Sequence, residues 1–157
     1  EQPNRWEGWQ IEILGTDVSA SVVDFARAAT YSNFQIQRGL GVAQMLAFFT
    51  ETDKGWQANQ RLRDMARYEI HNVLHPPPYP GQFDLIMCRN VLLYFDAPVR
   101  ERAFARISEA LAPDGRLVLG GGETVLGRSN WFVPDEERQA IYRRTDASGS
   151  KARAHAA

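Results

Sequence analysis

The sequence has few features that would form cross-links, cross a membrane or attract nucleic acid. Its one cysteine, Cys88, excludes an intrachain disulfide and fits a reducing compartment. No apolar run approaches the roughly 20 residues of a membrane-spanning helix, and no signal-peptide pattern opens the chain. The formal net charge is −1, so no overall positive field points to nucleic acid. We therefore expect a cytoplasmic protein without membrane insertion or a nucleic-acid partner.

The chain is also poor in metal-binding patterns. Only three histidines are present, and His71 and His75 fall on a predicted strand and loop, so their spacing does not place them on one helical face. What is present is an ordinary globular composition: 157 residues, 44% hydrophobic and 24% charged, enough for one domain with a real core. Because the chain begins at Glu1 in a polar stretch, we expect a fragment or a processed product.

Strand patterns alternate with helical patterns along most of the chain. Expected strands cover 11–16, 68–71, 83–88 and 116–119. Expected helices begin at Ser19, Val42 and Asp96, the last with Pro98 in its first turn. This alternation predicts an α/β fold with a mainly parallel sheet, and runs at 131–133 and 140–142 predict a closing antiparallel hairpin. Residues 53–55 have turn chemistry, and short antiparallel strands are expected in the stretch that follows, up to Arg67. The tail at 145–157 is expected to be disordered.

The strand at 83–88 ends in polar residues. Its near-continuous apolar run predicts a strand covered on both faces, with Cys88 packed inside. Arg89 and Asn90 follow at the carboxyl end, where open α/β sheets bind ligands. The planar guanidinium of Arg89 suits a carboxylate. The alternative is an internal ion pair of Arg89 with Asp84, Asp96 or Glu123.

Three further positions could bind a ligand. Asp17 ends the first predicted strand, where a carboxylate can accept hydrogen bonds from both hydroxyls of a ribose; equally, it could only cap the helix after it. The amide of Asn72 suits the edge of an adenine ring, although a loop asparagine is more often a turn residue. Tyr94, one helical turn past Asn90, either lines the same mouth or packs in the core.

The segment Phe83–Asp96 closely resembles one in the chemotaxis-receptor methyltransferases, the CheR family. The stretches 15–19, 31–40 and 111–115 support the resemblance. It implies a partial class I, Rossmann-like methyltransferase domain over 1–144, with a small β-subdomain at 48–67. It also implies S-adenosylmethionine as cofactor, methyl transfer to glutamate side chains, and the cytoplasmic domain of a chemoreceptor as partner.

Carried over position by position, the resemblance assigns roles to particular residues. The cofactor-binding set is Asp17, Asn72, Val73, Arg89 and Asn90, and the catalytic pair is Arg89 and Tyr94. No metal is implied. The methyl group would pass directly to an ionised glutamate, so no general base is needed.

The chain departs from the family pattern in two places. Where the family commonly has Gly-His-Ser-Glu, this chain has Gly-Gly-Gly-Glu at 120–123. It also shows no glycine-rich turn after a first strand, which in the family lies centrally between the strands at 11–16 and 83–88. Two interior edges would then lack a neighbour. We therefore expect a dimer or strand-swapped assembly, or a rearranged pairing that closes the gap.

Two alternatives to this function stay open. Another class I methyltransferase with a different substrate would share Asp17 but would not need the run Arg89–Tyr94. A non-catalytic module that binds a receptor or regulator is favoured by the missing glycine-rich turn.

Overall fold

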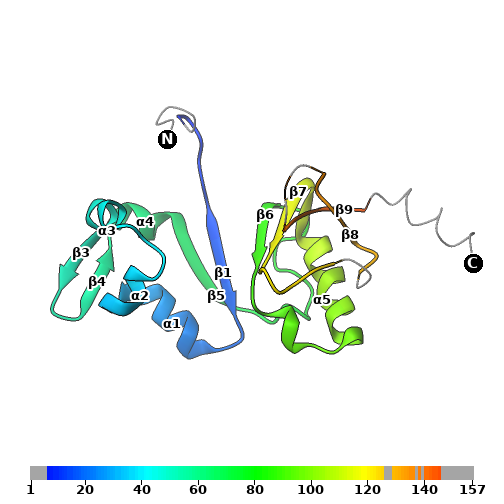
Figure 1. Cartoon of the computed structure of the whole chain (residues 1–157), viewed down its shortest axis with the longest axis horizontal. Helices are drawn as coiled ribbons and strands as arrows, with labels where there is room; N and C mark the ends of the chain where they lie inside the picture. Colours follow the sequence, from blue (N-terminus) through cyan, green and yellow to red (C-terminus); the bar gives the residue numbers. More distant parts are fainter. Residues whose placement is uncertain (1–6, 126–128, 137, 139, 146–157) are drawn as a thin grey trace, which may run out of the picture. The chain divides into compact units, whose positions relative to one another are not determined.

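The computed structural model describes residues 7–125, 129–136, 138 and 140–145, and the chain divides into two compact units (Figure 1). Unit 1 is Glu1–Asn72 and unit 2 is Val73–Ala157. Both combine helices with strands, which confirms the α/β class. Residues 146–157, which hold nearly all of the predicted disordered tail, lie outside the described part. No helix within the described ranges combines the length and apolar character needed to cross a bilayer.

The first sheet of unit 1 is a parallel pair, as predicted. Strand β1 (Ile13–Asp17) lies beside β5 (Ala66–Ile70), with Asp17 opposite Ile70 at their carboxyl ends. Helix α1 (Ala20–Ala28) connects them and packs against both. Its predicted N-cap is confirmed, because the Ser19 hydroxyl accepts the N–H of Val22.

The second sheet of unit 1 is small and antiparallel. Its strands, in spatial order, are β2 (Thr30–Tyr31), β4 (Gly55–Ala58) and β3 (Phe49–Thr52). The predicted turn before β4 is confirmed, and Gly55 has a φ of 120° there. Three short helices flank this sheet: α2 (Asn33–Gln37), α3 (Val42–Phe48) and α4 (Gln60–Met65).

The expectation of short antiparallel strands from the turn up to Arg67 was therefore wrong at 60–65. Asn59 starts helix α4 there, because its side-chain oxygen accepts the N–H of Leu62 and satisfies a free donor of the first turn. Helix α2 was not predicted at all. Ser32 and Gln35 form a capping box at its start, a pattern that is visible in the sequence.

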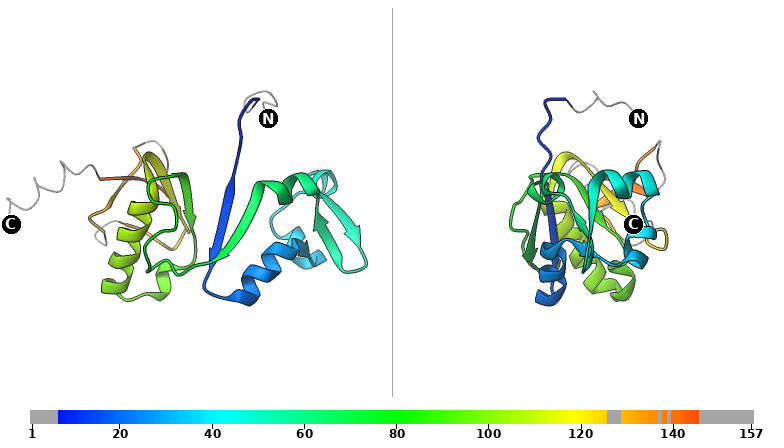
Figure 2. Two further views of the ribbon diagram at one scale, coloured as in Figure 1. Left: turned by 180° about the vertical axis from the view of Figure 1, so that it is seen from behind. Right: turned by 90° about the vertical axis from the view of Figure 1, so that its left-hand side faces the viewer.

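Unit 2 is a four-stranded sheet covered by one long helix (Figure 2). The spatial order is β6 (Phe83–Cys88), β7 (Leu111–Leu119), β9 (Ile141–Arg144) and β8 (Phe132–Pro134). Strands β6 and β7 are parallel, and β8 and β9 form the predicted antiparallel hairpin. Helix α5 (Ala97–Ala110) has Asp96 as N-cap and Pro98 in its first turn, also as predicted.

The core of unit 2 lies between α5 and the sheet. Its fully buried side chains include Leu92, Phe104, Leu111, Leu117 and Val125. Cys88 belongs to this core, which confirms its packing role. Burial, and secondarily the charge of Glu123, raise the pKa of the Cys88 thiol to about 12, so it stays protonated and unreactive at neutral pH.

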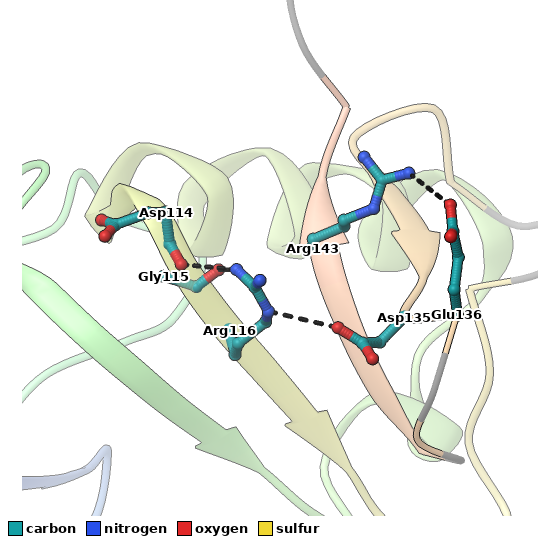
Figure 3. Close-up of polar contacts among 6 residues, drawn as sticks. All are labelled: Asp114, Gly115, Arg116, Asp135, Glu136 and Arg143. Atoms are coloured by element: carbon teal, nitrogen blue, oxygen red, sulfur yellow. Dashed lines mark hydrogen bonds and ion pairs between the residues drawn. The ribbon is translucent and has the colours of Figure 1, made fainter.

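The open face of the sheet carries two arginines directly opposite each other (Figure 3). Arg116 on β7 pairs in register with Arg143 on β9, an arrangement that by itself destabilises an antiparallel pair. Two acidic residues after β8 offset the repulsion. Asp135 lies 3.3 Å from Nε of Arg116, and Glu136 lies 3.6 Å from Nη2 of Arg143. These partly exposed ion pairs thus let the hairpin dock on β7.

The edge strand β6 corrects one prediction. Leu85 is 54% exposed and Met87 63% exposed, so β6 is not covered on both faces in the described part of the chain. Within the same residues β6 pairs only with β7, and β1 only with β5. Neither strand therefore gains a rearranged partner among the described residues. Each strand keeps one open hydrogen-bonding edge, which is the geometry that accepts a further strand.

Candidate functional site

The loop after β6 presents Arg89 to solvent. Its guanidinium makes no ion pair with Asp84, Asp96 or Glu123, the three partners that the sequence offered. Asp96 caps α5 through the N–H of Val99 instead, and Glu123 binds backbone groups. An exposed arginine at the carboxyl end of a strand is therefore available to an anionic ligand.

The carboxylate of Glu123 anchors the backbone of the same loop. Its Oε2 accepts the N–H of Asn90 at 2.8 Å and of Gly120 at 2.9 Å. Its Oε1 accepts the N–H of Val91 at 3.0 Å and of Leu92 at 2.8 Å. Partial burial alone raises the pKa of Glu123, but the four N–H donors outweigh it and leave the pKa below its ordinary 4.5. The carboxylate is thus charged at neutral pH.

Tyr94 lies in the exposed part of this loop. It ends a short 3₁₀ helix, Leu92–Tyr94, and is 79% exposed, so the interpretation as a core aromatic is wrong. Arg100 on α5 fixes the carbonyl side of the loop. Its Nε donates to the carbonyl of Leu92 at 3.0 Å and its Nη2 to that of Phe95 at 2.6 Å. Tyr94 therefore extends from an anchored backbone.

Asp17 lies at the carboxyl end of β1 in unit 1. Its Oδ1 accepts the N–H of Ser19 at 2.8 Å, which confirms a capping role. Its backbone carbonyl accepts the N–H of His71, just past β5, at 3.0 Å. For the other carboxylate oxygen, Oδ2, no hydrogen bond is seen among the described residues. One oxygen thus serves the helix and the other can meet a ligand.

The predicted site residues fall into two groups, one in each unit. Asp17 and Asn72 lie at or just past the carboxyl ends of β1 and β5 in unit 1. Arg89, Asn90 and Tyr94 share one loop of unit 2, and Val73 packs against the core of that unit. Sequence reasoning missed the anchoring by Glu123 and Arg100, since it depends on contacts that no local pattern encodes.

A cavity of about 450 Å³ lies elsewhere in unit 1. Its walls include Arg27, Tyr31, Arg63 and Tyr68, from the parallel pair, α1, α4 and the small sheet. None of the predicted site residues lines it. Among the described residues there is also no cluster of histidine, cysteine or acidic side chains fit for a metal ion.

The glycines at 120–122 differ in the space that each leaves for a side chain. A Cβ at residue 120 would lie 2.7 Å from Oε2 of Glu123 and 3.0 Å from Oδ1 of Asn90, whereas one at 121 or 122 would meet open space. We expect Gly120→Ala to lower the free energy of unfolding of unit 2 by about 1–3 kcal/mol. Gly121→Ala should leave it unchanged or raise it by up to about 1 kcal/mol, because alanine restricts the unfolded chain.

Urea denaturation of the two variants measures this difference. Equal stability of Gly120→Ala and Gly121→Ala would contradict the close approach of the two loops at Gly120.

Comparison with known proteins identifies the family to which the chain is similar. Residues 1–141 match the family described as "CheR methyltransferase, SAM binding domain". Chemotaxis protein methyltransferase 1 of Vibrio cholerae is 31% identical over 78% of this chain and 45% of its own length. Chemotaxis protein methyltransferase 1 of Pseudomonas aeruginosa is 33% identical over 73% of this chain and 42% of its own. The chain thus spans less than half the length of these relatives.

A third relative extends further along the chain. The probable biofilm formation methyltransferase WspC of Pseudomonas aeruginosa is 29% identical over 90% of this chain and 34% of its own length. The match at 1–141 contains β1, β5 and β6 together with every predicted site residue. The chain belongs to the CheR methyltransferase family, within the part described as the SAM-binding domain.

Proposed function

We propose that this chain provides part of the cofactor and substrate site of a protein-glutamate O-methyltransferase that acts on chemoreceptors and uses S-adenosylmethionine. The observation that carries the proposal is Arg89: exposed, without an ion pair to its three candidate acids, and held on an anchored loop inside the family match. Relatives named chemotaxis protein methyltransferases support the reaction and the chemoreceptor as partner.

The residues present fit the chemical groups of this cofactor. In our proposal Oδ2 of Asp17 accepts hydrogen bonds from ribose hydroxyls, while Oδ1 keeps its contact with Ser19. In our proposal Asn72 and Val73 flank the adenine. Arg89 and Asn90 face the methionine end, where the guanidinium pairs with a carboxylate.

The proposed chemistry is a direct displacement. When bound, S-adenosylmethionine supplies a methyl group made electrophilic by its sulfonium. A carboxylate oxygen of the receptor glutamate bonds to this carbon as the carbon–sulfur bond breaks and its electron pair stays on sulfur. No proton is transferred. Arg89 and Tyr94 are proposed to orient the incoming glutamate, so catalysis rests mainly on positioning and on exclusion of water.

We further propose where and in what assembly the chain works. A methyltransferase of chemoreceptor cytoplasmic domains acts in the cytoplasm. The open edges of β1 and β6, with exposed Ile13, Leu85 and Met87, would be covered by strands of another chain, as in a dimer or a strand-swapped assembly. A single methyltransferase domain over 1–144, with 48–67 as its β-subdomain, stays our proposed domain division.

A transfer assay with tritiated S-adenosylmethionine and a chemoreceptor cytoplasmic domain tests the function. We expect label on the receptor that base releases as methanol, the signature of a methyl ester. Arg89→Ala should slow the transfer at least about 10-fold, because one charge-assisted contact is lost. Arg102→Ala, which removes another exposed arginine of unit 2, is the control and should be neutral. Label that resists base, or no label, would contradict the proposal.

A further inference from the structure

The turn that carries Arg89 and Asn90 has an unusual backbone. Asn90 has a φ of 59°, in the left-handed region, which costs energy for any residue with a side chain. The N–H groups of Asn90, Val91 and Leu92 all point toward one carboxylate, that of Glu123. The turn is therefore held by a side chain that lies 31 to 33 positions further along the chain.

Glu123 lies where its carboxylate can hold the turn. It follows β7, the neighbour of β6, and its fourth donor is the N–H of Gly120 at the end of that strand. The missing side chain of Gly120 lets the Asn90 backbone approach. Both carboxylate oxygens thus accept two N–H groups each, and the exits of β6 and β7 are joined by one side chain.

The charged and titratable neighbours of Glu123 reinforce this arrangement. Arg100, from α5, lines with it a cavity of about 80 Å³ and holds the carbonyls of Leu92 and Phe95. The thiol of Cys88, at the end of β6, is the other titratable group nearby and stays protonated. As the pH falls below 4.5, therefore, Glu123 is the member of this group of three whose charge changes, because its pKa is lowered by the backbone N–H donors.

We propose that Glu123 is a positioning residue of the methyltransferase site: its carboxylate fixes the turn at 89–92 so that Arg89 and Asn90 present their side chains to the cofactor. This inference rests on the proposed function, and it assigns the retained acid of the Gly-Gly-Gly-Glu segment a role. It also explains why Gly121 and Gly122 can replace the family's usual residues. The carboxylate requires that residue 120 have no side chain, whereas side chains at 121 and 122 would meet open space.

The test compares Glu123→Gln with the wild-type chain by amide NMR during a titration with S-adenosylhomocysteine. Glutamine keeps the shape but turns an NH₂ group toward two N–H donors. We expect the dissociation constant to rise at least 10-fold at pH 7 and the amide signals of Asn90, Val91, Leu92 and Gly120 to move. Glu136→Gln, which alters an exposed ion pair of the same unit, is the matched control and should change affinity less than twofold.

A pH series of the wild type keeps the test independent of whether the variant folds. The pKa of Glu123 is lowered in the folded chain, so its contribution is present above pH 4.5 and is lost as the pH falls through the folded-state pKa. The four amide signals should shift together below pH 4.5, and affinity should fall with them.

Two failures can be told apart. Wild-type affinity in a folded Glu123→Gln variant, or affinity that does not follow the four amides, overturns the positioning role alone. A wild-type chain that binds no S-adenosylhomocysteine at millimolar concentration overturns the proposed cofactor site, and the positioning role with it.

Discussion

Replacing Asp17 by alanine is expected to weaken binding of S-adenosylhomocysteine by about 100-fold or more. Two charge-assisted hydrogen bonds to ribose hydroxyls contribute about 1.5–3 kcal/mol each, and every 1.4 kcal/mol is a factor of about ten in affinity. The free Oδ2 of Asp17, at the carboxyl end of a parallel strand, is the basis for this expectation. An NMR titration, which detects even millimolar binding, measures the change.

A control is needed because Asp17 also supports the start of α1. Ser19→Ala removes the N-cap acceptor for Val22 and should cost about 1 kcal/mol of stability without touching the carboxylate. If Asp17 acts on the cofactor, Ser19→Ala keeps nearly normal affinity. If both variants lose the same stability and neither loses affinity, Asp17 is only a helix cap.

Replacing Phe104 by alanine is expected to lower the free energy of unfolding of unit 2 by about 3–5 kcal/mol. The side chain belongs to α5, is 0% exposed within the core of unit 2, and has its ring centroid 6.0 Å from that of Phe132. A loss of this size is a large fraction of the stability of a small folded unit. Hydrogen exchange of the Leu117 and Leu119 amides in β7 measures it directly.

Phe34→Ala provides the matched control, in unit 1. This phenylalanine is 72% exposed, and the guanidinium carbon of Arg38 lies 5.6 Å from the centroid of its ring. Its removal should cost less than about 1 kcal/mol. The account of the core would fail if Phe104→Ala left exchange in β7 at the wild-type rate.

Elements with a local signal were predictable from the sequence. The caps Ser19 and Asp96 fix where α1 and α5 begin, and the turn at Gly55 separates two antiparallel strands, all as expected. The helix at 60–65 was missed because the polar stretch hides its period, although Asn59 offered a capping signal. Local chemistry therefore decided most elements, including one that was overlooked.

Features that depend on distant contacts were not predictable in the same way. The apolar run of β6 predicted burial on both faces, yet Leu85 and Met87 are exposed, because a sequence pattern states what a strand needs and not what covers it. Glu123 accepts hydrogen bonds from residues that lie 31 to 33 positions earlier in the chain, and no local sequence pattern predicts such bonds. The site residues were identified through family resemblance, and their roles stay predictions.

The exposed apolar side chains of β6 and the open edge of β1 bear on how the site is completed. Proposed site residues lie at the carboxyl end of β1, which is Asp17, and directly after that of β6, which are Arg89 and Asn90. A strand that paired with either edge would order the backbone leading into these residues. We therefore expect assembly and cofactor binding to strengthen each other.

The most direct test of the central claim is an amide NMR map of the ¹⁵N-labelled chain titrated with S-adenosylhomocysteine. The account predicts that signals at 15–19, 70–73 and 88–94 shift with one common dissociation constant, because each of these segments carries residues proposed to bind the cofactor. Shifts confined to other residues, such as those around the cavity beside Tyr68, or no shifts at all, would contradict the assignment of these strand ends to the cofactor.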